Sequence, residues 1–419
     1  MSAVAAGTVW SQLVGQEPAI ETLSAAVSDP DAMTHAWLFT GPPGSGRSVA
    51  ARTFAAALQC GERHGCAECA GCRTALAGTH ADVHLVVPEG LSISVAEMRA
   101  LVQTAARRPT TGHWQVVIVA DADRLTEGAS NALLKAVEEP PERTVFLLCA
   151  PSDHPEDVSV TIRSRCRLVT LRTPPQEAIS RVLTERDGVD PDRAEWAASV
   201  CGGHIGRARR LATDPAARGR RAEVLRIPVT LRRPSDVFAC ADVLIRAAEA
   251  DATEESMARD ETERAELRTA MGGDGTGKGV ASAKRAAEAA VRQLEKRQKS
   301  RATRTQRDTL DLALVDLAGF YRDVLVAGAL GETGATLIHP DHAEHSRAAA
   351  GRWSQETTLR RLEAVLACRE AIGWNVKPRI AVEAMVASLA EAISATDAGV
   401  AMASPAASDW RTPRPARRR

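Results

Sequence analysis

Residues 36–48 read AWLFTGPPGSGRS, and this stretch decides the fold of the first part of the chain. Its apolar start predicts a buried strand, and the following residues SVAARTFAAAL predict a helix. The glycine-rich turn between them is typical of a phosphate-binding loop, because the N–H groups of such a turn and of the helix N-terminus attract an anion. The order of strand, glycine turn and helix therefore predicts a nucleotide-binding-like site.

This loop departs from the usual phosphate-binding motif at one position. Gly41 and Gly46 satisfy the glycine spacing with Gly44 between them, and Ser48 offers a hydroxyl to a magnesium ion, but Arg47 stands where the motif has lysine. A planar guanidinium replaces a compact ammonium, so phosphates would be held differently. We expect a degenerate nucleotide site whose candidate ligands are ATP and Mg²⁺.

The second half of such a site would follow the apolar run QVVIVAD, residues 115–121. ATPases of this type place a metal-binding aspartate there, followed by a glutamate that activates water. Asp121 can still bind magnesium, or it can simply cap the helix that follows. Ala122 cannot act as a base, and general-base catalysis is typically worth about 10²- to 10⁴-fold. With both lysine and glutamate replaced, we predict a retained fold with little or no hydrolysis.

Apolar runs alternate with helical patterns through the first part of the chain. Besides the two already quoted, HLVVP at 84–88 and TVFLLCA at 144–150 read as strands. This alternation predicts an α/β fold with a doubly wound parallel sheet. Beyond residue 173 only helical patterns appear. The charged, alanine-rich residues 251–308 predict a mobile insertion or long solvated helices, and residues 391–419 predict a disordered basic tail.

Composition excludes several classes of protein. The 419 residues carry 53 basic and 53 acidic side chains, so a strongly basic protein that coats DNA is excluded. The N-terminal residues MSAVAAGTVW lack the basic and apolar regions of a signal peptide, and no run of about 18 apolar residues follows. We therefore expect a soluble, cytoplasmic protein without a membrane partner.

Four of the nine cysteines are clustered as Cys60-x5-Cys66-x2-Cys69-x2-Cys72. Four thiolates at this spacing suit a tetrahedral zinc ion and leave no open position for water, so the site would be structural. His64 is an alternative ligand in place of Cys60.

The residues VVIVADADRLTEGASNALLKAVEEPPERTVFLLCA, 116–150, and VTIRSRC, 160–166, resemble the clamp-loader branch of the AAA+ proteins. The altered phosphate loop and strand end are similar to those of the delta-prime subunits of bacterial DNA polymerase III within that branch. The resemblance extends from the lead-in VGQ to the helix GGHIGRARRLA, a little over half of the chain.

The resemblance implies a role for Arg165 and a departure from the family at Gly206. Arg165, in the Ser-Arg-Cys motif, would be an arginine finger that acts in trans on the ATP of a neighbouring subunit. The arginine with which the family's lid senses nucleotide aligns with Gly206, so this chain departs from the family there.

The resemblance also implies a domain plan. An AAA+ nucleotide-binding-like domain would span residues 1–172, with a zinc hairpin at 60–72. A helical lid would span 173–222, and a helical collar for oligomerisation would span 223–390, followed by the tail.

By this resemblance, the chain would be a clamp-loader subunit of the replicative DNA polymerase and would hydrolyse no ATP itself. Its partners would be gamma/tau- and delta-type subunits, the sliding clamp, and primed DNA through the complex. Two alternatives remain: an active ATPase motor subunit of the same loader, and a zinc-bearing nucleic-acid binding module. An aromatic content of 3% leaves few base-stacking side chains for the second alternative.

Overall fold

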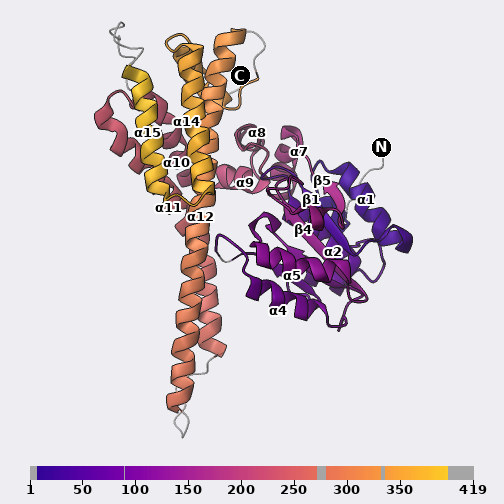
Figure 1. Cartoon of the computed structure of the whole chain (residues 1–419). Helices are drawn as coiled ribbons and strands as arrows, with labels where there is room; N and C mark the ends of the chain where they lie inside the picture. The colour runs from indigo at the N-terminus through magenta and orange to yellow at the C-terminus, as the bar shows by residue number, and fades with distance from the viewer. Residues whose placement is uncertain (1–6, 89, 271–279, 332–335, 395–419) are drawn as a thin grey trace. The chain divides into compact units, whose positions relative to one another are not determined.

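The computed structural model describes residues 7–88, 90–270, 280–331 and 336–394 (Figure 1). The chain divides into two units, Met1–Arg209 and Arg210–Arg419. The predicted fold class is confirmed, because the first unit is a parallel α/β sheet and the described part of the second is helical.

The first unit is built on five parallel strands in the order β2-β3-β4-β1-β5. The strands are β1 (Ala36–Thr40), β2 (Val83–Val86), β3 (Gln115–Val119), β4 (Thr144–Ala150) and β5 (Arg167–Thr170). Nine helices accompany them: α1 (Glu17–Ser28), α2 (Arg47–Leu58), α3 (Ala70–Ala77), α4 (Val95–Ala105), α5 (Glu127–Glu138), α6 (Val160–Arg163), α7 (Gln176–Arg181), α8 (Pro191–Val200) and α9 (Ile205–Thr213), the last of which runs into the second unit.

The central strands are buried on both faces, and alternate residues pack into two separate cores. One core joins the sheet to α1 and α2 through Trp37, Phe39, Val116, Ile118, Val145 and Leu147. The other joins it to α4 and α5 through Leu38, Val117, Val119, Phe146 and Leu148. Helices therefore cover both faces, as a doubly wound sheet requires (Figure 1).

Four of the five strands were predicted from the sequence, and β5 was not. This strand is four residues long, lies at the sheet edge beside β1, and buries only Val169 among its side chains. Such a strand has neither the apolar run nor the length on which a prediction rests. β5 leads to Leu171, whose N–H donates to the carbonyl of Thr40.

Short helical segments accompany the elements of both units. Those of the first unit are the 3₁₀ turns η1 (Val9–Gln12), η2 (Pro30–Ala32) and η3 (Ala122–Arg124) and the π-helical η4 (Val182–Arg186), and those of the second are the 3₁₀ turns η5 (Pro234–Asp236) and η6 (Pro340–His342).

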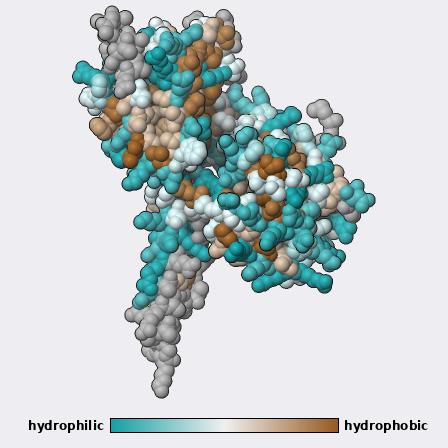
Figure 2. All heavy atoms as spheres, viewed as in Figure 1, coloured by the Kyte–Doolittle hydropathy of each residue, from teal (hydrophilic) through white to brown (hydrophobic). Residues whose placement is uncertain are grey.

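The second unit packs its helices around one apolar core. The helices are α10 (Pro215–Thr230), α11 (Val237–Ala270), α12 (Val280–Leu330), α13 (Ala343–Ala350), α14 (Gln355–Gly373) and α15 (Pro378–Ser394). The charged stretch 251–308 was expected to be a mobile insertion or long helices, and its described part belongs to α11 and α12. Where Figure 2 colours this pair, its surface is largely hydrophilic.

Ion pairs join α11 to α12 in this stretch. Arg301 lies 2.5 Å from Asp260 and 2.6 Å from Glu263. Hydrogen bonds from Arg301, ahead of the opposing effect of burial, lower the pKa of Glu263 to about 2. Residues 271–279 of the predicted insertion and 395–419 of the predicted tail lie outside the described residues, and α15 continues to Ser394.

Among the helices that the structure describes, none combines the length and apolarity that a membrane span requires.

Candidate functional site

The phosphate-type loop lies at the carboxyl edge of the sheet, between β1 and α2. All residues of β1 are buried, and α2 begins at Arg47, directly after Gly46. Gly44 and Gly46 have φ values of 86° and 90°, in the left-handed region that favours glycine. The predicted strand, turn and helix are therefore present, with Ser48 in the first turn of α2.

The side chain of Arg47 turns back onto the loop, where Nη1 donates a hydrogen bond to the carbonyl of Gly41. Its positive charge also opposes the rise that burial causes in the pKa values of groups at the ends of β3 and β4. Burial and then the charge of Asp121 raise the pKa of Asp123, while Arg47 acts in the opposite direction. Burial raises the pKa of Cys149 in β4 to about 12, and Arg47 again opposes the rise. Arg47 thus serves as an internal cation of this sheet edge.

Two segments distant in sequence lie against the loop. A Cβ atom placed on Gly44 would be 2.7 Å from the Cα of His204, so the residue that precedes α9 contacts the loop closely. Gln16, which is 3% exposed, donates through Nε2 to the carbonyls of Ser45 (3.2 Å) and Arg172 (2.6 Å). The N–H of Arg172 donates in return to Oε1 of Gln16 at 3.1 Å. The loop therefore contacts two distant segments, His204 at Gly44 and Gln16 at Ser45.

His204 also lies immediately before α9. Its Nδ1 accepts a hydrogen bond from the N–H of Arg207 at 3.2 Å, and burial lowers its pKa. Gly206 lies in the first turn of this helix and has no side chain that could reach a phosphate.

The end of β3 carries the second half of the predicted site. Asp121 immediately precedes η3, and Ala122 within it is 4% exposed. Alanine has no group that could accept a proton from water, so this edge of the sheet lacks the expected base.

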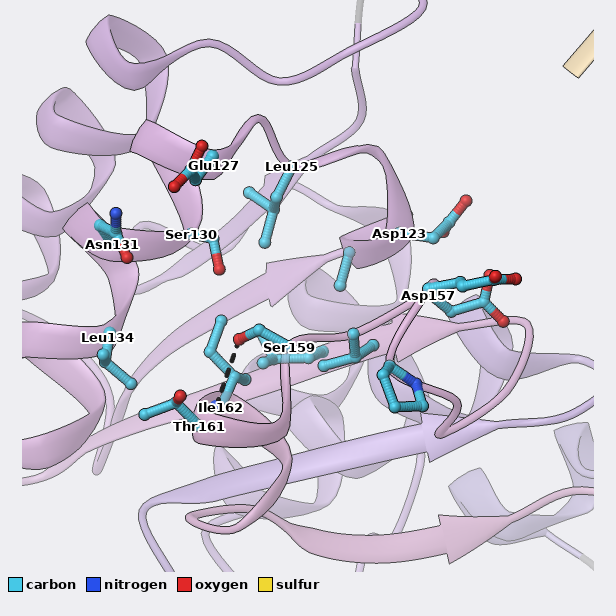
Figure 3. Close-up of a pocket in the computed structure, with 15 residues that line it drawn as sticks. Asp123, Leu125, Glu127, Ser130, Asn131, Leu134, Asp157, Ser159, Thr161 and Ile162 are labelled. Atoms are coloured by element: carbon cyan, nitrogen blue, oxygen red, sulfur yellow. Dashed lines mark hydrogen bonds between the residues drawn. The ribbon is translucent and has the colours of Figure 1, made fainter. Parts of the chain in front are cut away.

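A cleft of about 350 Å³ lies beside this strand end, between η3, α5 and residues 155–162 (Figure 3). Its polar lining includes Asp123, Glu127, Ser130, Asn131, Asp157 and Ser159, and its apolar lining includes Leu125, Leu134, Leu148 and Ile162. This cleft was not predicted from the sequence, because its walls come from segments that only the fold brings together.

Arg165 follows α6 and is held by groups of its own chain. Its Nη1 donates to the carbonyl of Thr161 (2.8 Å) and to Oγ of Ser164 (3.2 Å). Its Nη2 forms an ion pair with Oε1 of Glu138, the last residue of α5, at 2.7 Å. The side chain is 36% exposed. These contacts all involve α5, α6 and the turn after α6, and none of them involves the phosphate-type loop.

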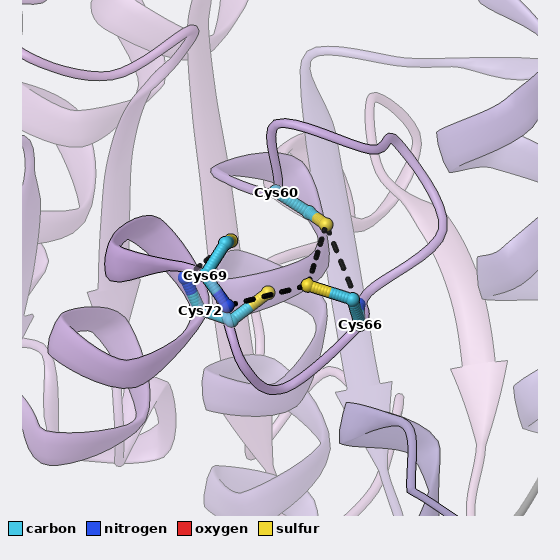
Figure 4. A group of neighbouring side chains, drawn as sticks. All are labelled: Cys60, Cys66, Cys69 and Cys72. Atoms are coloured by element: carbon cyan, nitrogen blue, oxygen red, sulfur yellow. Dashed lines mark hydrogen bonds between the residues drawn. The ribbon is translucent and has the colours of Figure 1, made fainter.

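The four clustered cysteines come together as predicted (Figure 4). The sulfur atoms of Cys60, Cys66, Cys69 and Cys72 all lie within 4.8 Å of one another. Backbone N–H groups of Cys66, Cys69 and Cys72 each donate to the sulfur of the preceding cysteine of the cluster at 3.4 Å. Such bonds favour thiolates, the form that binds metal. The donor set fits a four-coordinate ion.

The thiols differ in their acidity. Burial raises the pKa of Cys60, but hydrogen bonds led by the N–H of Cys66 outweigh it and lower that pKa to about 6. Burial raises the pKa of Cys72. His64, the alternative ligand, is not part of the group; its Nδ1 lies 3.0 Å from the carbonyl oxygen of Glu62. The structure therefore favours Cys60 over His64 as the fourth donor.

Three residues that contact the loop or Arg165 were not predicted from the sequence. Gln16 and His204 lie within the quoted stretches VGQ and GGHIGRA, but neither motif shows that its residue touches the loop. Glu138 lies in KAVEEPP, where the acidic pair and the prolines mark only the end of a helix.

Sequence comparison relates the first unit to proteins of DNA replication. Residues 15–175 match the family described as DNA polymerase III, delta subunit. This part of the chain is related to subunits of DNA polymerase III. The predicted resemblance is thereby confirmed.

Individual relatives agree with this assignment. The delta' subunit of Bacillus subtilis is 33% identical over 193 residues, which cover 46% of this chain and 58% of that subunit. The delta' subunit of Escherichia coli is 37% identical over 148 residues, which cover 34% of this chain and 44% of that subunit. The gamma/tau subunit of Mycobacterium tuberculosis H37Rv is 33% identical over 194 residues, which cover 45% of this chain and 33% of that subunit. The chain thus spans less than two thirds of the length of each of these relatives.

Among solved structures, a DNA polymerase III, gamma subunit-related protein of Thermotoga maritima is 15% identical, with a TM-score of 0.41. The match covers 89% of this chain and 99% of that one.

The contact between Gly44 and His204 gives a stability prediction. Gly44→Ala and Gly46→Ala both place a Cβ at a left-handed φ, which costs about 1–2 kcal/mol. Only the first also meets His204, since nothing lies within 4 Å of a Cβ on Gly46. We expect Gly44→Ala to lower the free energy of unfolding by about 1–3 kcal/mol more than Gly46→Ala, measured by urea denaturation of the full chain. Equal losses would show that His204 does not rest on the loop.

Proposed function

We propose that this chain is a non-hydrolysing subunit of a clamp loader, and that it supplies Arg165 to the ATP site of a neighbouring motor subunit. The observation that carries the proposal is the contrast between two arginines. Arg47 is turned inward onto its own loop, whereas Arg165 lies partly exposed on the surface after α6.

Three features of the chain's own site support the absence of hydrolysis. Arg47 replaces the lysine that would contact the terminal phosphates, Ala122 replaces the base, and Gly206 stands where the family's lid has arginine. The close approach of His204 to Gly44 supports a lid that contacts the loop directly. Binding of ATP and Mg²⁺ by Gly41, Gly44, Gly46, Arg47, Ser48 and Asp121 is not required by the proposal.

Arg165 suits the role of a finger in trans. A fixed guanidinium near a transferring phosphoryl group stabilises the charge that develops in the transition state. Its planar fork donates two parallel hydrogen bonds to a pair of oxygens, a geometry that an ammonium lacks. In other NTPases such fingers are worth roughly 10³- to 10⁵-fold in rate.

The relatives supply the setting of the proposal. Their names place them in DNA polymerase III as delta', gamma and tau subunits. We propose gamma/tau- and delta-type subunits as partners, and the sliding clamp and primed DNA as partners of the assembled complex in the cytoplasm. Residues 173–222 would form the lid, and residues 223–390 would join the subunits in a collar.

The cysteine group is proposed to hold one structural zinc ion. Its four sulfur donors fill a tetrahedral shell, so no position remains for a reactive water. The ion would fix residues 60–72, which run from just beyond the end of α2 into the first turn of α3.

Metal analysis tests the zinc proposal. Apparent binding energies of structural zinc are about 10–16 kcal/mol in zinc-finger peptides, so the ion should survive purification without chelator. We expect one zinc per chain in the wild type and in the control Cys166→Ser, whose thiol lies outside the cluster, and a substoichiometric amount in Cys66→Ser. Wild-type protein without zinc would contradict the proposal.

Clamp loading by reconstituted complexes tests the role of Arg165. We expect Arg165→Ala to leave assembly and metal content intact, to lower the DNA-stimulated ATPase rate in part, and to lower clamp loading more. The loss of ATPase is partial because the other ATP sites keep their own fingers. Arg165→Lys should restore little. The control is Arg193→Ala, which removes the same charge from an exposed position of α8. Equal loading rates for Arg165→Ala and wild type would remove Arg165 from the mechanism.

A further inference from the structure

The guanidinium of Arg165 is engaged on two sides by its own chain. One nitrogen donates to the carbonyl of Thr161, one turn back, and the other pairs with Glu138 at 2.7 Å. Both side chains of the pair are little more than one-third exposed, Arg165 at 36% and Glu138 at 38%. In this arrangement the nitrogens that a phosphate would need are directed at groups of the same subunit.

The position of Glu138 explains why it attracts a cation. It is the last residue of α5, and the C-terminal end of a helix carries partial negative charge. A carboxylate there is unfavourable unless a positive group lies beside it, and Arg165 is that group. The adjacent Glu139 is exposed and forms no ion pair with any side chain that the structure describes.

A carboxylate beside the finger opposes its task. The negative charge of Glu138 opposes the field of Arg165, and it would repel the terminal phosphate of a neighbouring ATP if it stayed within hydrogen-bonding distance. The guanidinium therefore has two competing partners, one in its own subunit and one in the next.

We propose that Glu138 is a positioning residue that holds Arg165 retracted in the free subunit and releases it when the neighbour's triphosphate takes its place. This inference rests on the proposed function. Assembly with a nucleotide-free neighbour leaves the ion pair closed, and ATP in that neighbour opens it. Arg165 is thus matched to the triphosphate state of the site that it serves.

The pair is weak enough to be exchanged in this way. Partly exposed ion pairs shift an equilibrium by no more than about fivefold, whereas a finger is worth roughly 10³-fold or more at its site. The Glu138–Arg165 ion pair, here called the latch, therefore adjusts the population of the extended arginine finger without preventing its use.

The first test uses the isolated full chain and does not depend on ATPase activity. An arginine-selective dicarbonyl reagent is applied, and modification of Arg165 is mapped by mass spectrometry. Glu138→Gln keeps the shape and removes the charge, so we expect modification of Arg165 up to about fivefold faster than in wild type at low salt. Glu139→Gln removes the same charge from the next position and should match wild type. Unchanged reactivity in Glu138→Gln would overturn the latch.

The second test uses reconstituted complexes with gamma/tau-type subunits. We expect Glu138→Gln to raise the ATPase rate at subsaturating ATP by up to about fivefold, with an advantage that shrinks at high salt as the wild-type pair is screened. The double variant Glu138→Gln/Arg165→Ala should equal Arg165→Ala alone. A lower rate in Glu138→Gln, with Arg165→Ala still impaired, would overturn the latch and leave the finger standing. A rate unaffected by Arg165→Ala would overturn the finger itself, and the latch with it.

Discussion

The burial of the central strands on both faces is the constraint on which the first unit depends. Because β1, β3 and β4 must be covered on either side, helices alternate with strands, and every strand ends at the same edge of the sheet. That edge receives the glycine loop after β1 and the Asp121-Ala122 turn after β3. The site is therefore placed by the packing of apolar side chains that take no part in its chemistry.

Two arginines of this unit, Arg47 and Arg165, are held by different kinds of partner. Arg47 donates a hydrogen bond to a carbonyl of its own loop, and its charge opposes the rise that burial causes in the pKa of Asp123. Arg165 follows a helix of only four residues and is restrained by one ion pair, one hydrogen bond to a backbone carbonyl and one to the hydroxyl of Ser164. A cation that is satisfied internally supports a fold, whereas a cation with a weak, exchangeable partner is suited to act on another molecule.

Much of this arrangement could be predicted from local patterns. The run AWLFT and the glycines after it specified β1, the loop and α2, and the spacing of four cysteines specified the metal-type cluster. The charge-rich residues 251–308 left two alternatives open, and the described part follows the helical one.

The contacts that adjust the site could not be predicted in this way. Gln16 reaches Arg172 across 156 positions, His204 meets Gly44, and Glu138 meets Arg165, and each pair depends on the fold rather than on a motif. The edge strand β5 was missed because its pattern is too short and too exposed.

The most direct measurement of the central claim is steady-state ATP turnover by the isolated full chain and by Ser48→Ala, compared at equal concentration. Ser48 is the hydroxyl that a working phosphate loop would direct at magnesium. If this chain acts on the ATP of another subunit, both proteins show the same background rate, and adding a gamma/tau-type subunit produces turnover that depends on Arg165. Steady turnover by the isolated chain that disappears in Ser48→Ala would contradict the account and identify the chain as a motor subunit in its own right.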